Sequence, residues 1–120
     1  MKKLLLLVLL LTSTAGLGAD NDKNFNSLGV RSCGRYLEAR TTMDWRTLID
    51  VYWIAGYITA FNRHRPNTYN VLGGGGMTSA LLWLDGWCWL NLSKDLSQGL
   101  EALTSELYPQ RYKTKKDAGR

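Results

Sequence analysis

The chain has 120 residues, two cysteines, one histidine and a formal net charge of +5. This length fits one domain with a single modest core. The positive charge lies at the two ends: Lys2 and Lys3 open the chain, and residues 111–120 hold five basic residues and one acidic residue. The body between them is close to neutral, which argues against nucleic acid as a partner.

Residues 1–19 have the three parts of a secretory signal peptide. Two lysines precede the apolar run Leu4–Leu11, and small residues follow up to Ala19. The run is too short to span a bilayer, so no stable membrane insertion is expected after cleavage; an uncleaved amino-terminal anchor is the alternative. We therefore expect a periplasmic or secreted protein of the bacterial envelope, with residues 20–31 as a flexible lead-in.

The rest of the chain predicts an all-α fold, because no segment alternates apolar and polar residues with a period of two. We expect a small four-helix domain over residues 32–108, followed by a basic tail at 109–120. The predicted helices are 33–40, 45–63, 79–90 and 94–107, with the caps Ser32, Asp44, Thr78 and Ser93 respectively.

The second predicted helix is apolar on nearly every side. One stripe runs through Trp45, Leu48 or Ile49, Tyr52, Ala55 or Gly56, and Thr59. We take this stripe as the core-facing side, with Asp50 on a polar back that turns apolar further along. Gly56 and Ala60 would let another helix approach closely. Such a helix belongs at the centre of a bundle, beside the third helix, or under a partner, and a homodimer is left open.

Cys33 and Cys88 are the only cysteines. In an exported chain they are most simply a disulfide, which would close a loop of about 56 residues. Two buried free thiols or an intermolecular link are the alternatives. Two cysteines and one histidine offer too few ligands for a metal site, so none is predicted.

Five tryptophans are many for this length. We expect most of them to fill the core, while one or two could stay exposed as binding anchors. Asp85 stands among apolar residues and needs a partner if it is buried, with Arg35 or His64 as candidates.

No motif predicts an enzyme or a cofactor. His64 has no identifiable nucleophile partner, and the sequence contains no G-x-S-x-G. Gly73–Gly76 is not followed by the lysine and hydroxyl residue of a phosphate loop, so it predicts a flexible joint. The basic tail predicts a solvated end, with weak attraction to anionic lipid, cell-wall polymer or an acidic partner as the alternative.

Three segments carry a family resemblance: SCGRYL at 32–37, WIAGYITAFN at 53–62 and WLDGWC at 83–88. Together they resemble the small exported helical proteins grouped around the type VI amidase immunity (Tai-like) proteins. They are also similar, more loosely, to the HdeA-type periplasmic acid chaperones. The resemblance implies a shared scaffold rather than an activity.

From the class and the resemblance we expect a non-catalytic binding protein of the immunity or inhibitor type, which occludes a toxin or cell-wall enzyme. The partner is a protein of unknown identity. Its contacts are predicted where an apolar stripe meets a basic loop, at Tyr57, Phe61, Asn62, Arg63, His64 and Arg65. An acid-stress chaperone is the alternative; one histidine offers it no trigger cluster.

Overall fold

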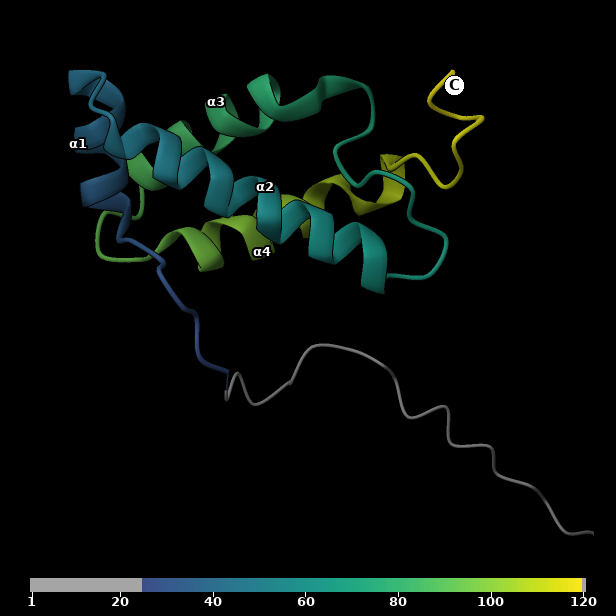
Figure 1. The fold of residues 1–120 in the computed structure, drawn as a ribbon, viewed down its shortest axis with the longest axis horizontal. Coiled ribbons are helices and arrows are strands. Elements are labelled where there is room, and N and C mark those ends of the chain that lie inside the picture. The colour runs from purple at the N-terminus through teal and green to yellow at the C-terminus, as the bar shows by residue number, and fades with distance from the viewer. Residues whose placement is uncertain (1–24, 120) are drawn as a thin grey trace, which may run out of the picture.

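The fold is known from a computed structural model that describes residues 25–119 (Figure 1). The predicted signal peptide at 1–19 lies outside the described residues. The described part is all-α, as predicted, with four helices and two short 3-10 turns and no strand. In chain order these are α1 (Cys33–Thr42), α2 (Arg46–His64), η1 (Gly73–Gly75), α3 (Gly76–Trp89), α4 (Leu96–Leu107) and η2 (Tyr108–Gln110).

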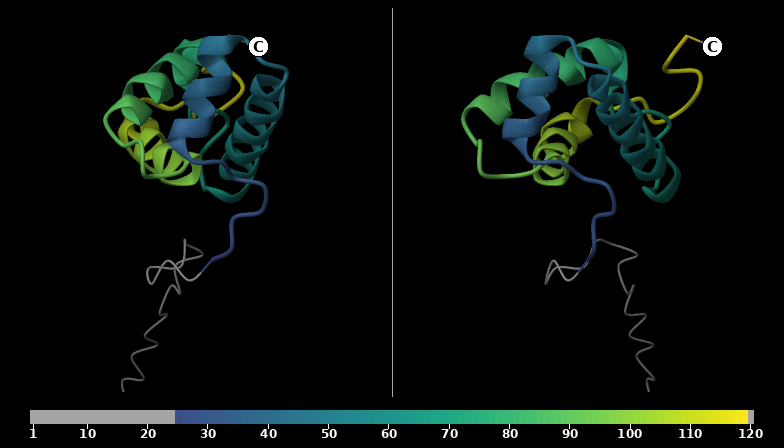
Figure 2. Two further views of the ribbon diagram at one scale, coloured as in Figure 1. Left: turned by 90° about the vertical axis from the view of Figure 1, so that its left-hand side faces the viewer. Right: turned by 60° about the vertical axis from the view of Figure 1, so that its left-hand side comes forward.

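The helices are arranged around α3, which packs against α1 and along α4. The α2 helix packs against α1 and α4, so the expectation that it lies at the centre of the bundle beside the third helix was wrong. Figure 1 shows α1 at one end of the molecule, with the other three helices extending away from it, and Figure 2 shows the same arrangement from two further sides. The connection from α2 to α3 and the C-terminal segment therefore meet at the opposite end.

A disulfide between Cys33 and Cys88 joins the first residue of α1 to the last turn of α3, as predicted. Both cysteines are fully buried, and their Cα atoms lie 4.9 Å apart. The two cysteines belong to the same buried apolar cluster as aliphatic residues of all four helices, including Leu37, Ile54, Leu84 and Leu100. The covalent link thus lies within the apolar core.

The helix boundaries follow local hydrogen bonds. Ser32 caps α1 as predicted, because its hydroxyl accepts from the Arg35 backbone N–H at 3.3 Å. The fourth helix begins at Leu96, two residues later than expected, and its cap is Asp95 rather than Ser93. Asp95 forms a reciprocal capping box with Gln98. The third helix begins at Gly76, earlier than the predicted cap at Thr78.

The face of α2 that we expected in the core is instead exposed. The buried side chains of α2 are Asp50, Ile54 and Ile58, which lie on the opposite side of the helix. Tyr52, on the predicted core stripe, is 75% exposed. A Cβ atom added to Gly56 would have nothing within 4 Å, so no helix approaches there. The assignment was wrong because Asp50 looks like a solvent-facing residue, yet Arg31 from the lead-in pairs with it in the fold.

The C-terminal segment is joined to the loop after α2. Tyr112 and Asn70 exchange backbone hydrogen bonds of 3.0 Å, and the side chain of Arg111 donates to the Asn67 carbonyl at 2.9 Å. The glycine run makes room for this contact. A Cβ atom on Gly73, where φ is +57°, would lie 3.1 Å from a backbone oxygen, and one on Gly74 would lie 3.0 Å from the Tyr112 hydroxyl.

Candidate functional site

A groove of about 600 Å³ lies where α1, α2 and α3 meet. Its lining residues come from α1, from the turn that follows it, from the start of α2 and from the last turns of α3. The turn between α1 and α2 forms one wall, and the last turns of α3 form the other. Its lining residues are Leu37, Arg40, Thr41, Met43, Asp44, Trp45, Thr47, Leu48, Asp85 and Trp89.

A network around Asp85 connects α1 with α3 beside this groove. Arg40 donates two hydrogen bonds to the Asp85 carboxylate, at 3.0 and 2.7 Å, and the buried Tyr36 hydroxyl donates a third at 2.7 Å. Burial, reinforced by the hydrogen bond to Asp85, raises the pKa of Tyr36, so the phenol stays a donor. The partners expected for Asp85, Arg35 and His64, were wrong, because the register of α1 places Arg40 beside it.

Large apolar side chains surround the groove without being covered. Trp45 is 70% exposed, Trp89 is 60% exposed and Met43 is 90% exposed. Tryptophan is the residue type most enriched at protein-binding hot spots. A group of bare aromatic side chains beside a groove is therefore suited to contact another protein.

The sequence predicts one or two exposed tryptophans but not where they lie. In the structure Trp45 and Trp89 are exposed, while the other three tryptophans pack against the core. Both exposed tryptophans stand at a helix end, where fewer neighbouring turns can cover a side chain. That position is the sequence signal that could have separated Trp45 and Trp89 from the rest.

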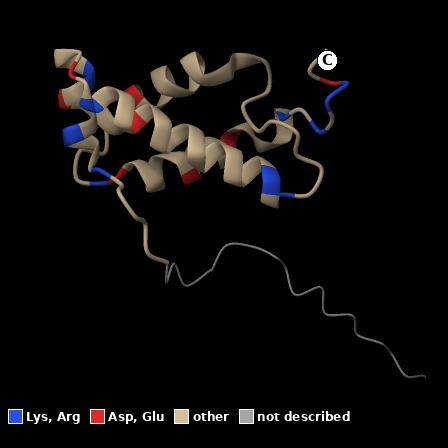
Figure 3. Cartoon of the chain, viewed as in Figure 1, with Lys and Arg blue, Asp and Glu red and all other residues tan. Residues whose placement is uncertain are grey.

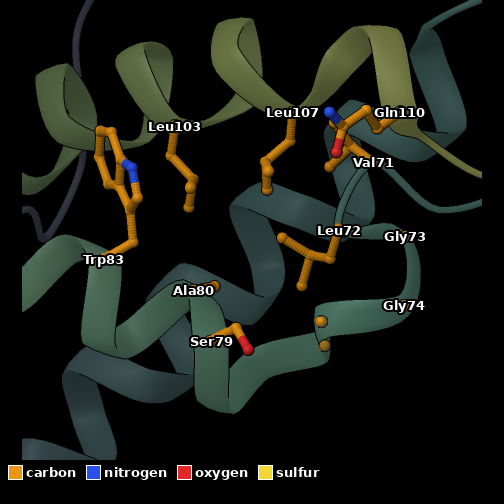
Figure 4. A pocket seen from close by; sticks show the side chains of 12 residues that line it. Val71, Leu72, Gly73, Gly74, Ser79, Ala80, Trp83, Leu103, Leu107 and Gln110 are labelled. Atoms are coloured by element: carbon orange, nitrogen blue, oxygen red, sulfur yellow. The ribbon is translucent and has the colours of Figure 1, made fainter.

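The second hollow, of about 280 Å³, lies between the glycine run and the C-terminal half of α4. Figure 4 shows Trp83, Leu103 and Leu107 around this space, with the backbone of Gly73 and Gly74 along one side. Apart from the Ser79 hydroxyl, the Gln110 amide and the indole nitrogen, its side chains are apolar. The cavity thus offers apolar contact and no acid–base pair.

The six predicted contact residues divide into two groups. Tyr57, Phe61 and Asn62 are half-buried and belong to the fold: the two rings pack against the core, and the Asn62 amide oxygen accepts from the Val71 N–H at 2.8 Å. Arg63, His64 and Arg65 are exposed at the end of α2. Only these last three can offer most of their surface to a partner, and their role stays a prediction.

Charge is distributed differently at the two ends of the molecule (Figure 3). The three ion pairs found among the described residues join Arg31 to Asp50, Arg40 to Asp85 and Arg46 to Asp44, and all lie toward the α1 end. At the other end, the basic end, the cations form no ion pair within the described residues. They are Arg63, Arg65, Arg111, Lys113, Lys115 and Lys116.

Within residues 25–119, no three His, Cys, Asp or Glu side chains gather in a group that could hold a metal ion. The same residues include no helix of the length and apolarity needed to cross a membrane. Comparison of the chain with protein-family models, with curated proteins and with solved structures finds no match. The function is therefore argued from the groove and the charge distribution.

Proposed function

We propose that this protein is a non-catalytic binding protein of the bacterial envelope, of the immunity or inhibitor type, that holds a partner enzyme through the groove. The observation that carries the proposal is the pair of exposed tryptophans, Trp45 and Trp89, beside a groove of about 600 Å³. The three segments that resemble the Tai-like proteins support the immunity type.

Rigid walls suit this groove to the binding of a folded partner. The disulfide and the Arg40–Asp85 pair both join α1 to α3, so the two walls are fixed relative to each other before any partner arrives. A preformed site loses little conformational freedom on binding, and more of the contact energy therefore appears as affinity. Because Arg40 is paired with Asp85, and Asp44 with Arg46, an apolar partner surface meets no unpaired charge there.

The proposal is tested by capture from an envelope extract of the source bacterium, with the purified chain as bait. We expect one enzyme to be retained at neutral pH and its activity to fall in proportion to the chain added. Replacing both Trp45 and Trp89 by Ala should weaken capture by at least 100-fold, since loss of each hot-spot side chain costs about 2 kcal/mol or more.

The matched control replaces Leu82 and Leu90 by Ala, because these are also exposed apolar residues but do not line the groove. This control should bind as the unmodified chain does. The proposal fails if the tryptophan variant captures the enzyme with unchanged affinity, or if the captured enzyme keeps its full activity. Loss of capture on replacing Arg63 and Arg65 by Glu, with the tryptophans intact, would move the contact to the residues predicted from the sequence.

A further inference from the structure

The basic end is built from two segments that are far apart in the sequence. Arg63 and Arg65 belong to the end of α2, whereas the three lysines follow η2 nearly fifty residues later. The backbone bridge between Asn70 and Tyr112 joins the loop after α2 to the segment that carries the lysines. The fold thus adds the two arginines of α2 to the charge that composition alone assigns to a tail, and all of these cations lie at one end of the molecule (Figure 3).

Two guanidiniums of the basic end are held by aromatic rings, and the lysines lie on a closed backbone turn. The guanidinium of Arg111 lies 3.8 Å from the centre of the Tyr108 ring, and that of Arg65 lies 5.1 Å from the centre of the Phe61 ring. Asp117 accepts from the backbone N–H groups of Lys113 and Thr114 at 3.0 and 2.9 Å, which closes the turn. The backbone that carries the lysines is therefore already ordered, while their exposed side chains are free to reach a partner.

We propose that the basic end is a docking surface for the anionic phospholipid headgroups of a bilayer. The cations are spread over a turn and a helix end, and none of them lines the groove or the cavity beside the glycine run. A surface of separate positive charges without a pocket fits an extended layer of phosphates better than one small anion. Tyr69, 39% exposed on the same loop, adds an amphipathic ring suited to the headgroup region.

Docking at this end leaves the groove accessible. The α2 helix has 19 residues and a length of about 28 Å, and it runs from the groove to the basic end. A chain bound to lipid through Arg63 and Lys115 therefore holds Trp45 away from the bilayer. Binding to a bilayer through the basic end does not require the proposed partner enzyme. The two proposals can therefore be tested separately.

The test is co-sedimentation of the chain, purified from the cell envelope, with vesicles. We expect binding to phosphatidylcholine vesicles that contain 30% phosphatidylglycerol at 0.1 M NaCl. Binding should be lost at 0.5 M NaCl and absent from pure phosphatidylcholine. Replacing Lys115 and Lys116 by Gln should raise the lipid concentration for half-binding about 30-fold. A second variant, Arg63→Gln with Arg65→Gln, should act in the same direction.

The matched control is Arg35→Gln with Lys94→Gln, which removes the same charge from the α1 end, where both side chains are exposed. The control should change the lipid concentration for half-binding by less than threefold. Circular dichroism should show that each variant is folded. The proposal is overturned if anionic vesicles do not bind the chain at 0.1 M NaCl. It is equally overturned if the control weakens binding as much as the lysine variant, or if soluble polyphosphate binds the chain while vesicles do not.

Discussion

The two ends of α2 combine the same kinds of side chain in opposite ways. Around its first turns, arginines are paired with aspartates and the aromatic side chains of Trp45 and Trp89 are bare. Around its last turn, the cations form no ion pair with any residue that the structure describes, and the guanidiniums of Arg65 and Arg111 lie over aromatic rings. Charges that are paired inside the fold suit the groove end to the apolar contact that we propose for it. Charges that are not paired suit the other end to the electrostatic contact that we propose there.

The ends also differ in how they are held together. The groove end has a covalent bridge and ion pairs between helices, while the basic end depends on backbone hydrogen bonds between a loop and the C-terminal segment. Changes at the groove end should therefore have the larger effects on global stability.

Removing the disulfide should have the largest effect. Replacing Cys33 and Cys88 by Ala releases a loop with a sequence separation of 55, for which loop-closure entropy predicts a loss of about 4 kcal/mol. Urea unfolding of the variant, compared with the unmodified chain, measures this loss. A loss under about 1 kcal/mol would show that packing alone fixes α1 against α3.

Removing the Asp85 carboxylate should have the second-largest effect on stability. Asp85→Ala leaves the buried Tyr36 hydroxyl without its acceptor and Arg40 without its counter-ion, which should cost about 2–3 kcal/mol of unfolding free energy. Asp44→Ala is the matched control, because Asp44 is half-buried to a similar degree but binds only the side chain and backbone N–H of its near neighbour Arg46. It should cost less than Asp85→Ala, since Asp44 joins no two helices. Equal losses in the two variants would contradict the importance given to the network beside the groove.

Two glycines should respond to alanine with opposite signs. A Cβ atom on Gly99 would lie 3.0 Å from the Trp87 ring and 3.1 Å from Leu84, so Gly99→Ala should destabilise by about 1 kcal/mol. Gly56 faces open space inside a helix, so Gly56→Ala should stabilise by about 0.5–1 kcal/mol. Thermal unfolding of the two variants, compared with the unmodified chain, measures both changes. A destabilised Gly56→Ala variant would show that the exposed face of α2 is covered in solution.

Acid should have the smallest effect on stability. Burial raises the pKa of Asp50, so this group favours the folded state more as the pH falls. The hydrogen bonds from Arg46 lower the pKa of Asp44, and those from the backbone of Thr114 lower the pKa of Asp117, so these two groups act in the opposite direction. Near-ultraviolet circular dichroism should therefore keep its native signal from pH 7 to pH 4. A cooperative loss of signal in that range would favour the acid-chaperone alternative.

How far the sequence predicts this structure depends on whether the signal is local. The helix at Cys33, the cap at Ser32 and the disulfide follow from short patterns and from the number of cysteines. The buried face of α2 does not, since Asp50 becomes a core residue only through Arg31, which precedes α1. The groove could not be predicted from local patterns either, because it forms where three helices that are separate in the sequence meet.

If the two ends of the molecule act independently, each can be disabled without the other, and a single cross-over experiment measures this. The tryptophan variant (Trp45→Ala with Trp89→Ala) and the lysine variant (Lys115→Gln with Lys116→Gln) are both assayed for partner capture and for vesicle binding. We predict that the tryptophan variant loses capture and keeps vesicle binding, and that the lysine variant does the reverse. Loss of both activities in either folded variant would contradict the account.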